Sequence, residues 1–257
     1  MSAVARRPTT VGFAEQYAVA AGRFAAAVAS TDLRAPVPAC PGWTAYDLVV
    51  HLGNVHAWAA TIVETRRRAA EQNDEPRSGR PRAVSQWYAA KAEDLFEVLR
   101  CTVPDEPCWT FVEHEGVAEF WARRQLHETT IHQVDLDSSA GRPCDIDGGV
   151  AADGVQEVLD TMLRRMHHRG YPAALDRPLA VVATDVPDRW LLTPQPPGPP
   201  AVRRRRDGAA AAVPDRVAAP VATLYRLLWH RPVDEPGVRV SGDAGRVRGF
   251  LASRLTP

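Results

Sequence analysis

The sequence lacks the features of membrane-spanning, exported and polyanion-binding proteins. No stretch approaches the roughly 20 consecutive apolar residues of a membrane-spanning helix. Arg6-Arg7 would suit a twin-arginine export signal, but no uncharged apolar region with a cleavage site follows. The 31 Lys and Arg residues balance the 31 Asp and Glu residues, so no net field favours nucleic acid or anionic lipid. We therefore expect a cytoplasmic protein that acts on a small molecule, with no membrane and no nucleic-acid partner.

Cysteine is also scarce. Four cysteines are scattered along 257 residues, and no two of them form a C-x-x-C pair. This spacing argues against a disulfide framework and against a thiolate zinc cluster. We expect four reduced thiols. Cys40 lies near the start of a predicted helix, where a packed turn residue is favoured over a low-pKa nucleophile.

The apolar residues that are present recur mainly at helical spacing, and 45% hydrophobic content is enough for a real core. Helices are predicted over residues 13–28, 44–71, 84–99, 120–140 and 155–169. The first four, joined by loops, favour an antiparallel four-helix bundle. The composition changes at Gly170-Tyr171-Pro172. We therefore predict an α+β protein with a helical domain over 1–170 and a smaller α+β domain over 171–257.

The predicted second domain mixes short strands with helices. Strands are expected at 179–183, 190–192 and 238–240, and helices at 217–229 and 243–255. The Pro-rich run 194–200 predicts an exposed connector. The arginine run 203–206 predicts a solvated strand or loop, because the balanced charge argues against a nucleic-acid arm.

The densest polar pattern lies in the predicted helix 120–140, which neither Pro nor Gly interrupts. One stripe at the helical period contains Trp121, Arg124, Glu128, His132 and Asp135. Apolar neighbours border this stripe, so its polar groups are expected to face a buried site. Glu128 and His132 are four residues apart and can reach one metal ion. A single E-x-x-x-H is also common on helix surfaces as an ion pair, and the residues alone leave both interpretations open.

A metal site needs a third ligand, for which His51 is the best candidate. It follows a Pro41-Gly42 turn and a predicted helix start, where Thr44 and Asp47 fit a capping box. The core stripe of this helix is expected to contain Leu48, Leu52, Val55, Ala59 and Ile62. His51 lies on the flank of that stripe.

Two longer sequence motifs contain the three candidate ligands. The C-P-G-W-T turn with its following H-L-G spans Cys40 to Gly53, and an R-R-x-x-H-E-x-x-x-H-x-x-D helix spans Arg123 to Asp135. Together with similar segments in the second half, they resemble the mycothiol-dependent maleylpyruvate isomerase family, a branch of the DinB-like metal-binding bundles. The resemblance implies a DinB-like bundle followed by a mixed domain. It also implies that His51, Glu128 and His132 bind zinc or another divalent metal.

Two imidazoles and one carboxylate leave a fourth metal position open, as in catalytic zinc sites. Water bound there would have its pKa lowered to about 7 and a coordinated thiol would be deprotonated, so the ligands alone leave hydrolysis and thiolate chemistry both open. The resemblance implies mycothiol as the thiol cofactor and the cis-trans isomerisation of maleylpyruvate as the reaction. The alternatives are a mycothiol S-transferase that acts on an electrophile, and a non-catalytic metal-binding or thiol-binding protein. A small-molecule thiol and an electrophilic substrate are therefore the expected partners.

Three further polar residues have candidate roles. Asp135 is expected either to orient a ligand imidazole or to pair with an arginine, and Arg124 either to neutralise Glu128 or to contact an anionic substrate. The family places an arginine of the second domain toward the active site, and Arg231 is the match in this sequence. The chain departs from the family there, because Ala219-Pro220 and His230 stand where glycine is usual.

Overall fold

The computed structural model describes residues 12–71, 73–112, 116–206, 213–233 and 237–257. The chain divides into two compact units, Met1–Cys144 and Asp145–Pro257. The first unit is helical apart from a two-stranded hairpin and the second mixes helices with a five-stranded sheet, so the predicted α+β class is confirmed. In the part of the chain that is described, no helix is both long and apolar enough to cross a lipid bilayer.

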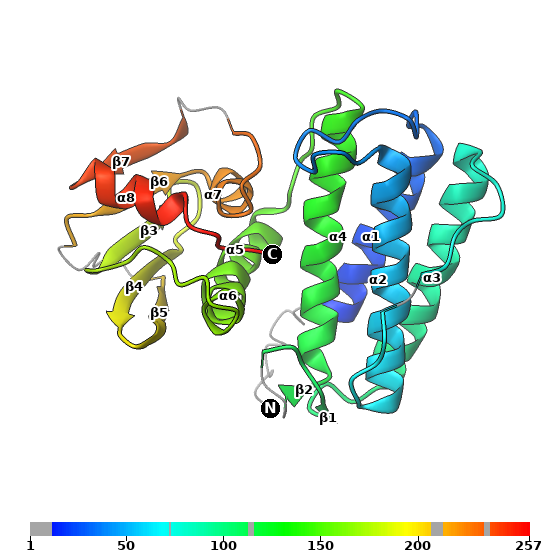
Figure 1. Ribbon diagram of the computed structural model, residues 1–257, viewed down its shortest axis with the longest axis horizontal. Coiled ribbons are helices and arrows are strands. Elements are labelled where there is room, and N and C mark those ends of the chain that lie inside the picture. Colours follow the sequence, from blue (N-terminus) through cyan, green and yellow to red (C-terminus); the bar gives the residue numbers. More distant parts are fainter. Residues whose placement is uncertain (1–11, 72, 113–115, 207–212, 234–236) are drawn as a thin grey trace, which may run out of the picture. The chain divides into compact units, whose positions relative to one another are not determined.

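Four long helices form a bundle in the first unit. They are α1 (Phe13–Ala29), α2 (Ala45–Thr65), α3 (Pro81–Cys101) and α4 (Glu119–Ser139). Both α1 and α2 pack against α3 and α4, as Figure 1 shows. The core between them contains the fully buried side chains of Phe24, Leu48, Leu95 and Leu126. A short hairpin of β1 (Pro107–Cys108) and β2 (Gly116–Val117) precedes α4.

The start of α2 forms as the sequence predicts. The Thr44 hydroxyl accepts a hydrogen bond from the Asp47 amide at 3.3 Å, and the Asp47 carboxylate accepts one from the Thr44 amide at 2.8 Å. These two bonds satisfy amides that the first helical turn leaves without partners. The helix ends at Thr65, earlier than expected, where Arg66 adopts a left-handed conformation with φ 62°.

A close approach of α2 and α3 explains the glycine of the H-L-G motif. A Cβ atom added to Gly53 would lie 2.3 Å from the indole ring of Trp87 on α3. Only a residue without a side chain fits at this point without displacing the ring. Gly53 therefore fixes the spacing of two bundle helices, one of which carries His51.

The second unit is built around one sheet. Its elements are α5 (Gly148–Glu157), the π-helical turn η1 (Val158–Met162), α6 (Leu163–His168), β3 (Leu179–Ala183), β4 (Arg189–Gln195), β5 (Gly198–Arg205), β6 (Arg216–Ala219), α7 (Val221–Leu228), β7 (Arg239–Ser241) and α8 (Ala244–Leu251). The strand order is β5-β4-β3-β6-β7, with only the β3–β6 pair parallel. α7 packs on β3 and β6, whereas η1 and α6 contact β5.

The division between the units differs from the predicted boundary at residue 170. It lies before α5, between Cys144 and Asp145. The reason is packing: α5 contacts α7, and the indole of Trp190 on β4 donates a hydrogen bond to Gln156 at 2.9 Å. The change in composition at Gly170 marks the passage from helix to strand inside the second unit.

Two predicted elements of the second unit also differ from the structure. The Pro-rich run is a strand hairpin, in which β4 and β5 pair with Gln195 opposite Gly198. Pro199 and Pro200 are tolerated because β5 is the edge strand, and Pro194 of β4 lies where the register of the pair shifts between Thr193 and Gln195. Residues 217–219, predicted as helix, belong to β6, which pairs with β3. Pro220 follows at the N-cap of α7 and favours extended backbone in the residue before it.

Candidate functional site

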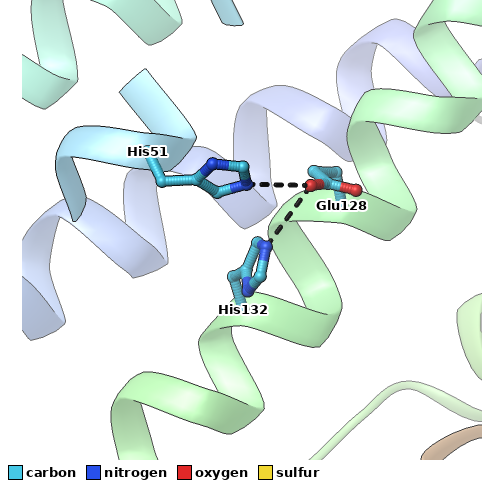
Figure 2. A group of neighbouring side chains, drawn as sticks. All are labelled: His51, Glu128 and His132. Atoms are coloured by element: carbon cyan, nitrogen blue, oxygen red, sulfur yellow. Dashed lines mark ion pairs between the residues drawn. The ribbon is translucent and has the colours of Figure 1, made fainter. Parts of the chain in front are cut away.

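The structure brings His51, Glu128 and His132 together, as Figure 2 shows. His51 comes from α2, and the other two residues come from successive turns of α4. The Oε1 atom of Glu128 lies 3.6 Å from Nε2 of His51 and 3.3 Å from Nε2 of His132. One donor atom from each residue lies within 4.8 Å of the other two. These three residues could therefore hold a single metal ion.

The spacing of the donor atoms fits a tetrahedral metal. Zinc bonds to imidazole nitrogen and carboxylate oxygen are about 2.0–2.2 Å long, so two ligand atoms of a tetrahedral site lie about 3.4 Å apart. The two distances from Glu128 Oε1 to the histidine nitrogens, 3.6 Å and 3.3 Å, fall on either side of that value. Both histidines face the carboxylate oxygen through Nε2. Three protein donors leave the fourth tetrahedral position for an exchangeable ligand.

Asp135 contacts His132 at Nδ1, the ring nitrogen that does not face Glu128. Its buried carboxylate lies 2.9 Å from Nδ1 of His132. In the neutral ring, this contact favours the tautomer that carries its proton on Nδ1 and directs the Nε2 lone pair at the site. The thiol of Cys40 also approaches this carboxylate, with Sγ 3.9 Å from Oδ2. The geometry favours the orienting role that the sequence left open for Asp135.

Arg124 neutralises Glu128, which was one of its two predicted roles. Its Nη2 atom lies 2.7 Å from Oε2 of the carboxylate, and its side chain is only 4% exposed. The alternative role, contact with an anionic substrate, is disfavoured by this burial. Glu128 thus uses its two oxygens differently: Oε1 faces the histidines and Oε2 faces the guanidinium.

The contacts within the site shift the pKa values of Glu128 and His132. Burial alone would raise the pKa of Glu128, but Arg124 and the two histidines outweigh it and hold that pKa well below its usual range. Burial would lower the pKa of His132, yet the carboxylates of Asp135 and Glu128 raise it to about 9. Without a metal the site is therefore a partly buried ion-pair network, and a cation entering it must displace a proton.

The C-P-G-W-T turn lies against the same site. Gly42 has a positive φ of 86°, and the turn is closed by a bond from the Val37 amide to the Trp43 carbonyl at 2.9 Å. This turn places the indole of Trp43 against the ring of His51, with centroids 4.9 Å apart. Packing of this kind restricts rotation of the His51 ring. No pattern in the sequence indicated this role for Trp43.

A second polar cluster, which the sequence analysis missed, is buried in the bundle next to α4. The imidazole of His56 on α2 lies 2.7 Å from Oε1 of Gln125 on α4 and 3.1 Å from the hydroxyl of Tyr88 on α3. All three residues are buried, and burial lowers the pKa of His56 to about 4. The burial of His56 could have been predicted from the sequence, because position 56 falls between Leu52 and Ala59 on the core stripe of α2.

Arg231 belongs to the second unit. It follows α7, and its guanidinium lies over the Trp229 ring, 5.8 Å from the centroid, and donates to the Trp229 carbonyl at 2.8 Å. His230 has a positive φ of 57°, which explains why glycine would suit that position. A role for Arg231 in binding substrate carboxylates stays a prediction.

Comparisons with known proteins show what the sequence and the fold are similar to. Residues 14–137 match the family model described as the mycothiol maleylpyruvate isomerase N-terminal domain. No curated protein matches the chain. Crystal structures of the mycothiol-dependent maleylpyruvate isomerase and of its mutant with one histidine changed to alanine share the fold, each with a TM-score of 0.57. They are 16% and 14% identical to this chain, and each comparison covers 90% of this chain and 96% of the other.

The family match covers the helical unit, including the turn before α2 and all three candidate ligands. The structural likeness extends through both units. Residues 14–137 therefore belong to the mycothiol maleylpyruvate isomerase N-terminal domain family, and the chain shares the fold of the mycothiol-dependent maleylpyruvate isomerase structures.

Proposed function

We propose that this protein is a metal-dependent enzyme that uses mycothiol to isomerise maleylpyruvate or a closely related cis-unsaturated acid. The observation that carries the proposal is the convergence of His51, Glu128 and His132 on one point at spacings suited to a tetrahedral metal. Family membership supports the choice of thiol and of substrate class. Zinc is the preferred ion, because two imidazoles and one carboxylate are a donor set of its catalytic sites.

The metal and the thiol would each supply one chemical property. A divalent ion held by the three ligands would lower the pKa of a thiol bound at the open position, so that the thiol is a thiolate at neutral pH. Mycothiol would supply the sulfur that adds to the cis double bond, after which rotation about the new single bond and loss of the same thiol give the trans isomer. The thiol is regenerated unchanged.

The protein side chains prepare this site before any reactant binds. Asp135 fixes the orientation of the His132 ring through Nδ1, and Trp43 packs on the His51 ring. Arg124 offsets the charge of Glu128, so that the buried carboxylate stays ionised. Arg231 is our candidate for the cation that binds a substrate carboxylate. Groups held in place in this way need no reorganisation when reactants arrive.

A thiol-dependent isomerase assay tests the proposal. We expect the full-length protein to convert maleylpyruvate to fumarylpyruvate only when mycothiol is present, to lose this activity after chelation, and to regain it when Zn²⁺ is returned. His132→Ala should remain inactive after Zn²⁺ addition, because it lacks one of three ligands.

Two outcomes would contradict the proposal. Stable thioether products in mass spectra, with no isomerisation, would identify an S-transferase, which keeps the same site but ends the reaction at the adduct. Isomerisation that survives both chelation and His132→Ala would show that the three residues do not hold a required metal.

A further inference from the structure

The two oxygens of Glu128 lie in different environments. Oε1 faces both histidine Nε2 atoms, whereas Oε2 lies 2.7 Å from the Arg124 guanidinium. Arg124 is one helical turn before Glu128, and its side chain is almost fully buried. The contact is therefore a charge-assisted hydrogen bond with little water around it, which is among the stronger polar contacts in proteins.

This contact bears on how Glu128 would bind a metal. A carboxylate can hold a cation through one oxygen or through both. Turning Oε2 toward the histidines would break its bond to Arg124 and leave a buried guanidinium without that partner, which is costly. The pairing therefore resists binding through both oxygens.

We propose that Arg124 is a positioning residue that restricts Glu128 to one-oxygen ligation and so keeps a metal coordination position open for the thiol. The inference rests on the proposed metal site. It assigns Arg124 a role beyond neutralising a buried charge, since neutralisation alone would not decide how many carboxylate oxygens reach the metal. Without Arg124, Glu128 gains the freedom to occupy a second position.

Cobalt spectroscopy on the full-length protein separates these roles, because the visible absorption of Co²⁺ weakens strongly as its coordination number rises. We expect an intense visible band in the wild type and at least a threefold weaker band in Arg124→Met. Arg124→Lys should restore most of the intensity, because an ammonium group can still hold one carboxylate oxygen. Arg142→Met is the matched control: it removes another partly buried arginine–carboxylate pair, with Asp137 at 2.9 Å, and should leave the band unchanged.

An unchanged band in cobalt-loaded Arg124→Met would overturn the inference, whatever happens to its stability. If that variant does not fold, infrared difference spectra of the wild type with and without Zn²⁺ provide the second test. A wide separation of the two carboxylate stretching bands indicates one-oxygen binding and supports the inference, whereas a narrow separation indicates two-oxygen binding and overturns it. If the wild type binds neither Co²⁺ nor Zn²⁺, the proposed metal site itself is wrong, and the inference falls with it.

Discussion

At the scale of single residues, the i, i+4 spacing of Glu128 and His132 was enough to predict that they share one face of a helix. His51 was the best candidate for a third ligand, and the family motif supported that choice, because spacing along the chain does not indicate which residue of α2 meets α4. The pairing of Arg124 with Glu128 was one of two open alternatives. Which alternative holds is decided by burial, and burial follows from the packing of the whole bundle.

The buried His56 gives a prediction about pH. Its pKa of about 4 in the folded chain is below the usual 6.5, so the folded state favours the neutral ring. As the pH falls from about 6.5 toward 4, the unfolded chain takes up a proton that the folded chain does not, and stability is lost. We expect His56 to cost the protein about 2 kcal/mol of stability between pH 7 and pH 4.5.

Urea unfolding of the wild type and of His56→Gln at both pH values measures this contribution. The other acid-sensitive groups are common to both proteins, so the difference between their pH dependences reports His56. The free energy of unfolding of the variant should fall by about 2 kcal/mol less than that of the wild type between pH 7 and pH 4.5. Equal losses would mean that His56 is not held neutral in the core.

At the scale of elements, the long helices of the first unit were predictable. A capping box and a regular apolar stripe mark α2, α1 and α3 have apolar stripes of their own, and neither Pro nor Gly interrupts α4. The β4–β5 hairpin and the start of β6 were not, since pairing between strands is set by partners far away in the sequence. The close contact of α2 with α3 could not be predicted from the sequence either. Gly53 stood in a motif, but only the position of Trp87 shows why a glycine is needed there.

Substitution of two helical glycines tests this packing. Gly53→Ala should destabilise the protein by about 1–3 kcal/mol, because its Cβ would overlap the Trp87 ring. Gly22 in α1 is exposed, and an added Cβ there meets nothing within 4 Å. Gly22→Ala should therefore stabilise the protein by about 0.5–1 kcal/mol through helix propensity. Thermal unfolding of both variants gives the comparison, and a stabilised Gly53→Ala would show that α2 and α3 are not in close contact at this point.

At the scale of the whole molecule, the sequence predicted two parts but placed the boundary at a change of composition. The observed division depends on which elements pack together: α5 packs with α7, and η1 and α6 contact β5. The three candidate ligands and the residues that support them, Arg124 and Asp135, all lie in the first unit. Metal binding is therefore expected to be a property of the bundle, with one ion for each chain.

A metal titration tests this central claim most directly. Metal-free full-length protein is titrated with Co²⁺, and the bound metal is measured by elemental analysis after removal of excess. We expect one ion per chain in the wild type and in the control His168→Ala, whose histidine is exposed in the second unit. His132→Ala should bind at least about 100-fold more weakly, because it keeps two of three ligands. One tightly bound ion per chain in His132→Ala would contradict the account.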